Sequence, residues 1–214
     1  MELDSETDET SRIVELVKVE QENLNQSIRV ERLSFRIVLI SIFSALAIVL
    51  GYLLAYIPNI ELFTLTIFLS GFILGKRDGM IVGFLSSLIF CFFNPLSASP
   101  LPLLTFQLFH YSLTGLLGGL ISSLNKKKQI FRINEDLYKF SIMIIFGSIG
   151  AIITLNFQVI ATLIHFLSFY GPGGEFLPVF ISGIGFTVVH IIGNTLGFIF
   201  ILPGLIQLIN KMLY

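Results

Sequence analysis

The chain has 214 residues, of which 54% are hydrophobic and 13% charged, and its net charge is -1. A mean hydropathy of +0.88 excludes a water-soluble domain of this size and indicates an integral membrane protein. The near-zero net charge gives no reason to expect a nucleic-acid partner, and a single cysteine excludes a disulfide framework.

The N-terminal segment is strongly polar. Its first 28 residues carry eight acidic side chains and no apolar run, which excludes both a cleavable signal peptide and a membrane span. Apolar residues recur there at roughly helical spacing, so the segment is either an amphipathic helix or a disordered tail. We therefore predict a cytoplasmic tail over residues 1–35 and a membrane domain over residues 36–214.

Six apolar runs predict an all-α membrane domain with six transmembrane helices rather than a barrel. The expected spans are 37–57, 61–75, 79–93, 103–124, 140–167 and 178–202. The second and third are short, roughly 22 Å of helix against a hydrocarbon core of about 30 Å. One continuous helix would place Lys76, Arg77 and Asp78 at mid-membrane, where each charge costs roughly 3 kcal/mol. Two short spans joined by a hairpin are therefore predicted, with a re-entrant pair as the alternative.

The sixth predicted helix is followed by Pro203 and Gly204, which we expect to end it. The remaining C-terminal segment is short and apolar, and it would lie along the membrane interface.

The distribution of Lys and Arg predicts that both termini are cytoplasmic. Turns 58–61, 94–102 and 170–177, which would share one side of the membrane, contain neither residue type. Basic side chains concentrate on the cytoplasmic side of membrane proteins, so the opposite side is predicted to be the inside. The basic residues are Arg12, Lys18, Arg29, Arg32 and Arg36 before the first span, Lys76 and Arg77 after the second, Lys126, Lys127, Lys128, Arg132 and Lys139 after the fourth, and Lys211 after the sixth.

Small residues recur four positions apart, which predicts close helix packing because lipid supplies no hydrophobic drive between helices. In the second to sixth spans the recurring glycines are Gly71, Gly75, Gly79, Gly83, Gly115, Gly119, Gly193 and Gly197. The first span carries two further small-residue ridges and little polar content, so it is the predicted docking surface for a partner protein. The residues of these ridges are Ser41, Ala45, Ala47 and Gly51.

Each of the last three spans carries one polar stripe, whereas the first three carry almost none. The stripes are Gln107, Tyr111 and Thr114, with His110 beside them, then Thr154, Gln158 and His165, and finally Thr187, His190 and Asn194. A polar group inside a membrane must find a partner or face a cavity, so these stripes either bond each other or line a pocket.

Depth along the helices separates the polar residues into two groups. The outer residues and the outer turns would form a pocket open to the outside, with the glycine-rich turn 171–174 either a mobile lid or a plain connection. The deeper His190 and Asn194 should mainly bond neighbouring helices and support stability. The predicted ligand contacts are Asn94, Gln107, Tyr111, Gln158, His165, Tyr170 and Glu175.

Motifs of the common enzyme classes are absent from the sequence. There is no HExxH, GxSxG, paired-glutamate protease signature or phosphate-binding GxxxxGK[ST]. The three histidines lie on three different predicted helices without nearby carboxylates or thiols, so we expect no metal site. The chain is predicted to be neither an enzyme nor a cofactor binder, and it has no ATP site with which to drive uptake by itself.

Several glycine-rich segments resemble the substrate-binding S component of energy-coupling factor (ECF) transporters over residues 36–204. The segments are IPNIE at 57–61, LSGFILGKRDG at 69–79 with Gly83, NP at 94–95 and GLLGG at 115–119. The resemblance implies a six-helix protein of the cell membrane that captures a vitamin or similar micronutrient from outside. It would work with a transmembrane coupling protein and two ATPases.

The resemblance also implies where ligand and partner would bind. The family's pocket is formed by the later helices and outer loops, and its first helix docks the coupling protein through an AxxxA pattern. The nearest matches here are Ser41 with Ala45 and Ala47 with Gly51, neither of which is strictly alanine. Two other classes stay open at this point: a membrane scaffold or assembly protein whose stripes hold the helices together, and a stand-alone channel or secondary carrier.

Overall fold

The computed structural model is helical, with no strand among the residues that it describes, which are 33–54, 57, 60–94, 98–133, 135–171 and 173–213. The all-α prediction is therefore confirmed. The chain divides into two compact units, Met1–Leu39 and Ile40–Tyr214, and the description below concerns the second. Most of the predicted acidic tail and its amphipathic helix lie outside the described residues.

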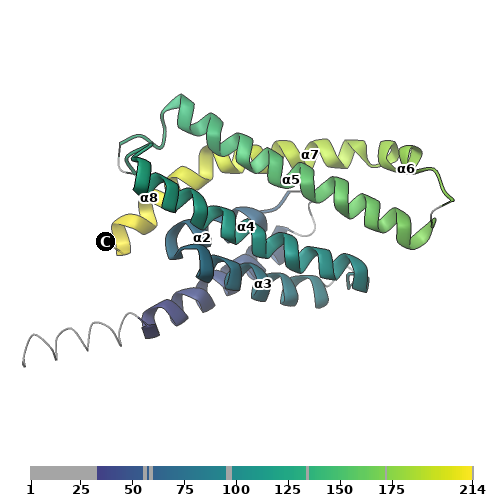
Figure 1. Ribbon diagram of the computed structural model, residues 1–214, viewed down its shortest axis with the longest axis horizontal. Coiled ribbons are helices and arrows are strands. Elements are labelled where there is room, and N and C mark those ends of the chain that lie inside the picture. Colours follow the sequence, from purple (N-terminus) through teal and green to yellow (C-terminus); the bar gives the residue numbers. More distant parts are fainter. Residues whose placement is uncertain are drawn as a thin grey trace, which may run out of the picture. The chain divides into compact units, whose positions relative to one another are not determined.

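The predicted hairpin of two short helices is present as α2, Phe63–Leu74, and α3, Lys76–Phe92 (Figure 1). Gly75 alone separates them, with a φ of 97°, in the left-handed region that favours glycine. Lys76, Arg77 and Asp78 are thus the first turn of α3 rather than a loop. Because α2 and α3 are separate helices, the prediction that these charges do not lie inside one continuous span is confirmed.

Glycines bring the backbones of α2, α3 and α4, Leu101–Lys128, into direct contact. A Cβ atom built on Gly71 would lie 1.8 Å from the carbonyl oxygen of Gly115, and one on Gly83 would lie 2.2 Å from that of Tyr111. One on Gly118 would lie 2.0 Å from the carbonyl oxygen of Phe68. The prediction that small residues serve close packing is confirmed for these three helices.

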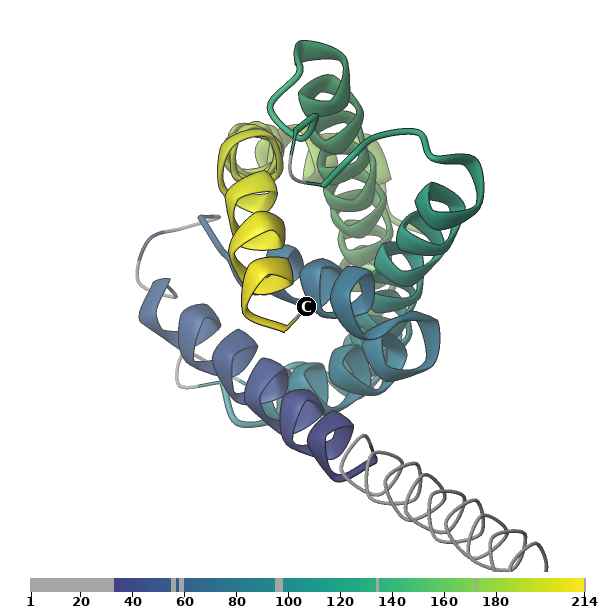
Figure 2. The ribbon, with the colours of Figure 1, turned by 90° about the vertical axis from the view of Figure 1, so that its left-hand side faces the viewer.

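A second group of helices begins with α5, Phe140–Phe169, which turns back through the short α6, Phe176–Ser182. It continues into α7, Ile184–Leu196, which packs along α5 (Figure 1). The predicted sixth span is therefore divided at Gly183. Figure 2 shows α2 between α4 and the C-terminal helix α8, Leu202–Leu213, and it contacts both.

The prediction that Pro203 and Gly204 end the last helix is wrong, because both residues lie inside α8. A π-helix, η1, Gly197–Ile201, joins α7 to α8 without a break in the helical run. Proline lacks an N–H and its ring clashes with the carbonyl four residues earlier in an α-helix. The wider π turn directly before Pro203 relieves that conflict, and the helix changes direction there instead of stopping (Figure 1).

Three helices are long and apolar enough to cross a membrane: Leu33–Leu54, Phe140–Phe169 and Ile184–Met212. Helix α2 is apolar but has only 12 residues, and α4 has 28 residues with three lysines in its last turn. The protein is thus a multi-helix membrane protein, while the count of six spans stays a prediction.

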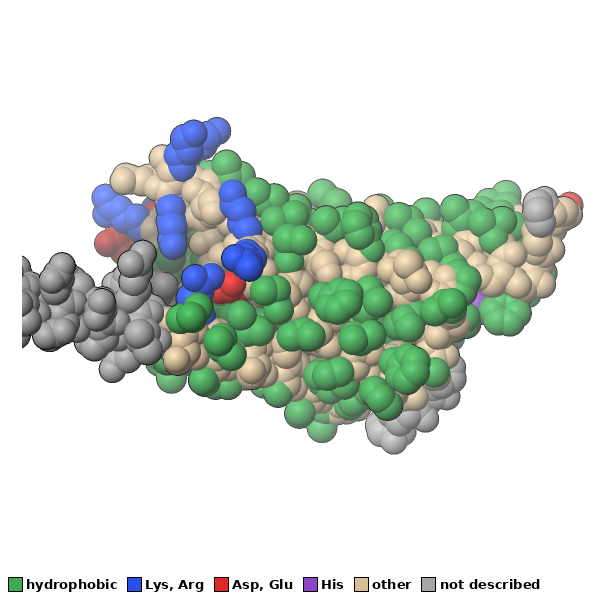
Figure 3. All heavy atoms as spheres, turned by 60° about the horizontal axis from the view of Figure 1, so that its bottom comes forward, with side chains coloured by type: hydrophobic (Ala, Val, Ile, Leu, Met, Phe, Trp, Pro, Cys, Tyr) green, Lys and Arg blue, Asp and Glu red, His purple; other side chains and the backbone are tan. Residues whose placement is uncertain are grey.

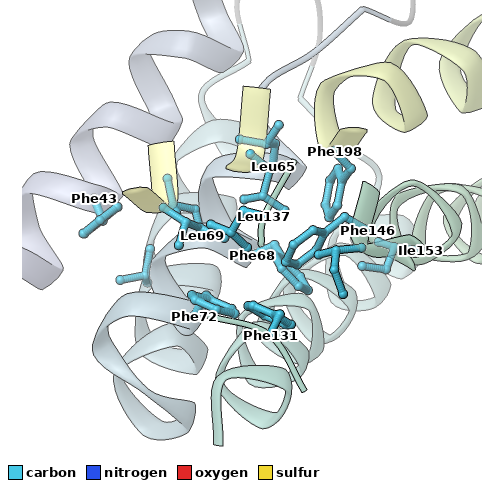
Figure 4. Packing of buried hydrophobic residues seen from close by; sticks show 14 residues of the cluster. Phe43, Leu65, Phe68, Leu69, Phe72, Phe131, Leu137, Phe146, Ile153 and Phe198 are labelled. Atoms are coloured by element: carbon cyan, nitrogen blue, oxygen red, sulfur yellow. The ribbon is translucent and has the colours of Figure 1, made fainter. Parts of the chain in front are cut away.

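A cluster of buried aromatic rings joins the two groups of helices (Figure 4). The ring of Phe68 on α2 lies 5.1 Å from that of Phe198 in η1. Phe131, which follows α4, lies 5.8 Å from Phe146 on α5. These contacts fix α2 at the centre of the bundle, and Glu61 precedes it in the chain.

Lys and Arg side chains gather at one end of the described structure, and hydrophobic side chains cover the surface beside them (Figure 3). Lys76 and Arg77 begin α3, the three lysines end α4, and Arg132 and Lys139 lie in the connection to α5. Large apolar residues such as Phe84, Phe140 and Ile152 are exposed, as expected for a lipid-facing surface. The orientation of this charged end relative to the cell stays a prediction.

Candidate functional site

Four of the seven predicted ligand contacts lie among packed side chains. Asn94 follows α3, Gln107 and Tyr111 lie on α4, and Gln158 lies on α5. Tyr111 is only 4% exposed and its ring meets Phe63 edge-on at 4.8 Å. Gln107, one helical turn earlier, is half-buried, and its Oε1 atom is buried without a hydrogen-bond partner among the described residues. Gln158 and Asn94 are half-buried as well.

The other three predicted contacts lie at the hairpin between α5 and α6. His165 is exposed with its ring 4.6 Å from Phe169, and Tyr170 is exposed and stacks on Phe166. Glu175 is exposed directly before α6. The seven residues therefore fall into two groups rather than one cluster, and their role in ligand binding stays a prediction.

The densest polar cluster of the described structure lies deeper, between α2, α5 and α7. Asn194 donates from Nδ2 to Thr154 Oγ1 at 2.9 Å and to Glu61 Oε1 at 3.3 Å. His190 Nε2 lies 3.2 Å from the same carboxylate oxygen, to which the Thr64 hydroxyl also donates. The expectation that His190 and Asn194 bond neighbouring elements is confirmed.

Glu61 is the residue that sequence reasoning missed, because it was assigned to an outer turn. Its carboxylate instead accepts bonds from α2 and α7 within a largely buried site, with the side chain 17% exposed. It is the only acidic residue between Glu31 and Asp78 and it directly precedes an apolar span. That isolation was the available signal, since an ionisable group at the edge of a span marks a functional site by default.

Glu61 is separated by long stretches of helix from Lys76 and Lys139. Helix α2 separates it from Lys76 by roughly 18 Å of helix. Thr154 lies about 21 Å along α5 from the end that carries Lys139. At such separations a unit charge contributes less than about 1 kcal/mol at an effective dielectric constant of about 20. The N-terminus of α2, just after Glu61, provides a partial positive charge.

His190 uses one of its two ring nitrogens in a hydrogen bond. Its Nε2 atom meets the carboxylate, while Nδ1 is buried with no partner in the described structure.

A group of aromatic rings centred on Phe157 of α5 lies beside this polar cluster. The Phe157 ring lies 6.2 Å from that of His190, 5.1 Å from that of His110 and 5.8 Å from that of Tyr111. His110 is buried, and its Nε2 atom has no partner among the described residues. Phe157 thus contacts both Tyr111 of α4, which belongs to the predicted outer pocket, and His190 of the deeper polar cluster.

A groove of about 270 Å³ opens between α4 and α5 next to these aromatic rings. It is mostly apolar, with His110, Thr114 and Asn156 supplying its polar atoms. The remaining lining residues are Leu113, Leu117, Ile152 and Ile153. Such a volume suits a compact molecule. No group of three His, Cys, Asp or Glu side chains within the described ranges is arranged to hold a metal ion.

The two small-residue ridges of the helix Leu33–Leu54 have different surroundings. Ala47 is fully buried against α2 and α3, and a Cβ atom on Gly51 would lie 2.7 Å from the Phe90 ring. Ser41 and Ala45 are exposed. Of the four predicted docking residues, only these two are accessible to a partner.

The comparisons with known proteins give a match to one protein family. No curated protein and no solved structure gives a significant match. The family described as "ECF transporter, substrate-specific component" matches residues 35–213, which is most of the chain and includes every residue of the polar cluster. Members of this family are transport subunits that bind small molecules and work with a coupling protein and ATPases. The chain belongs to the family of ECF transporter substrate-specific components.

Proposed function

We propose that this protein captures a vitamin or a similar micronutrient from outside the cell and binds it at the polar cluster around Glu61. A separate transmembrane coupling protein and two ATPases would supply the energy for uptake. The observation that carries the proposal is a carboxylate in a largely buried site, bonded to α2 and α7 and separated by long stretches of helix from Lys76 and Lys139. Such a group is costly to maintain in a membrane protein unless it serves a ligand.

The surrounding residues fit a binding pocket better than a purely structural contact. Gln107 Oε1, His110 Nε2 and His190 Nδ1 are buried without partners among the described residues. Buried polar atoms are normally hydrogen-bonded, so three vacant ones, two of them on histidines whose rings lie beside Phe157, indicate that a ligand completes them. The exposed residues of the α5–α6 hairpin, His165, Tyr170 and Glu175, would lie at the entrance from the outside.

The test is native mass spectrometry of the gently solubilised full chain. We expect the wild type to carry one small molecule per chain and Glu61→Ala to lack it. Ser168→Ala is the matched control, since Ser168 is exposed and bonds only to its own helix at Ile164. A wild type without a bound small molecule, or a Glu61→Ala variant with full occupancy, would contradict the proposal. Thermal stability recorded in parallel separates loss of ligand from loss of fold.

A further inference from the structure

We infer that the ligand of this site is a small organic cation with N–H donors, bound through Glu61. The inference rests on the proposed function, because it assumes that the cluster around Glu61 is the substrate site. It adds the chemical class of the substrate: a protonated amine, an amidinium group or a protonated nitrogen heterocycle.

The first argument is the arrangement of bonds on the carboxylate. All three of its hydrogen bonds, from Thr64, His190 and Asn194, go to Oε1. Within the described part of the chain, Oε2 therefore has no hydrogen bond. The side chain keeps 17% exposure, so a ligand can reach it. One oxygen is held in place by the protein and the other is available for recognition.

The second argument is charge. The donors of Thr64 and Asn194 are neutral, so neither compensates the charge of the carboxylate. Lys and Arg side chains gather at the charged end (Figure 3), and the nearest of them in sequence, Lys76, is separated from Glu61 by the whole of α2. The α2 N-terminus supplies only about half a positive charge. A ligand cation would complete the neutralisation, whereas an anionic ligand would meet repulsion.

The third argument is the balance of donors and acceptors. Gln107 Oε1 is a buried acceptor without a partner in the described structure, and Glu61 Oε2 is a second vacant acceptor. A ligand that contacts these two oxygens must bring donors. The rings of Phe63, Tyr111 and Phe157 add aromatic surfaces, which attract cations.

The experiment uses probes that differ in charge but little in shape. Benzamidinium is compared with benzamide, and phenethylammonium with 2-phenylethanol, with benzoate as the anion. The readouts are displacement of the copurified small molecule in native mass spectrometry and the thermal stability of the full chain. Each cation should act at a concentration about 100-fold below that of its neutral partner, as expected for a partly buried charge pair.

Two substitutions at Glu61 assign the preference to the carboxylate. Glu61→Gln keeps the shape and removes the charge, so the preference for cations should disappear. Glu61→Asp keeps the charge, so the preference should remain even if binding weakens, and this variant decides the point should Glu61→Gln fold poorly. Equal action of neutral and cationic probes on the wild type would overturn the inference, as would an unchanged preference in Glu61→Gln.

Failure of the inference can be told from failure of the proposed function. A copurified molecule that is displaced by benzamide or benzoate as readily as by the cations leaves a substrate site but removes the cation assignment. A wild type that carries no small molecule and responds to none of the probes overturns both.

Discussion

At the scale of single residues, Asn194 links two helices to the carboxylate. Its Nδ2 group donates to Thr154 on α5 and to Glu61 before α2. Replacement by leucine keeps much of the volume but removes both bonds. We expect Asn194→Leu to lower the free energy of unfolding by about 1–3 kcal/mol, since a buried acceptor loses its donor. Thermal unfolding in detergent measures this, with Ser168→Ala as a control that should change little; an unchanged melting temperature would show that the bond is dispensable.

The sequence predicted the part of this cluster that has helical periodicity. Thr187, His190 and Asn194 share one face of α7 and are all buried, as the stripe suggested. Glu61 was missed because its partner His190 lies 129 positions away, and no local pattern reports such a contact. The sequence shows a lone carboxylate beside an apolar run, but tertiary packing decides which way the Glu61 side chain points.

At the scale of elements, the helix Leu33–Leu54 presents two faces to different surroundings, which gives a matched pair of substitutions. Ala45→Leu adds bulk on the exposed face, so it should impair assembly with the coupling protein and leave ligand binding intact. Gly51→Leu drives a side chain into Phe90 and Phe63 and should destabilise the fold by about 1–3 kcal/mol. Co-purification of the transporter complex and thermal unfolding distinguish the two. Normal assembly of Ala45→Leu would place the docking surface elsewhere.

Helix boundaries were predicted correctly where local chemistry decides them. The predictions failed where packing decides the boundary. Gly75 ends α2 because the chain must adopt a positive φ there, and the sequence marks that point with glycine followed by charges. Pro203 also looked like a terminator. Its helix continues because η1 alters the hydrogen-bond spacing just before it, with Phe198 buried against Phe68 of α2. That compensation comes from a distant contact and has no local signature.

At the scale of the whole molecule, the grouping of basic side chains at one end predicts the orientation in the membrane. Cysteines introduced at Ser99 and Gly173 should react with an impermeant reagent in intact cells, and one at Lys127 should not. Gly173 has room for a side chain, and Lys127 is exposed, so accessibility within the fold does not limit either site. The native Cys91 is buried and should stay silent. Labelling at Lys127 alone would invert the topology.

The glycine contacts between α2, α3 and α4 also bear on permeability. Where the carbonyl of Gly115 touches Gly71 and that of Tyr111 touches Gly83, the helices leave no lumen wide enough for a file of water molecules. Ions and protons therefore have no standing route through this block from the polar cluster to the lysine-rich end. A substrate bound at Glu61 could leave between α2, α3 and α4 only if these helices separated or tilted.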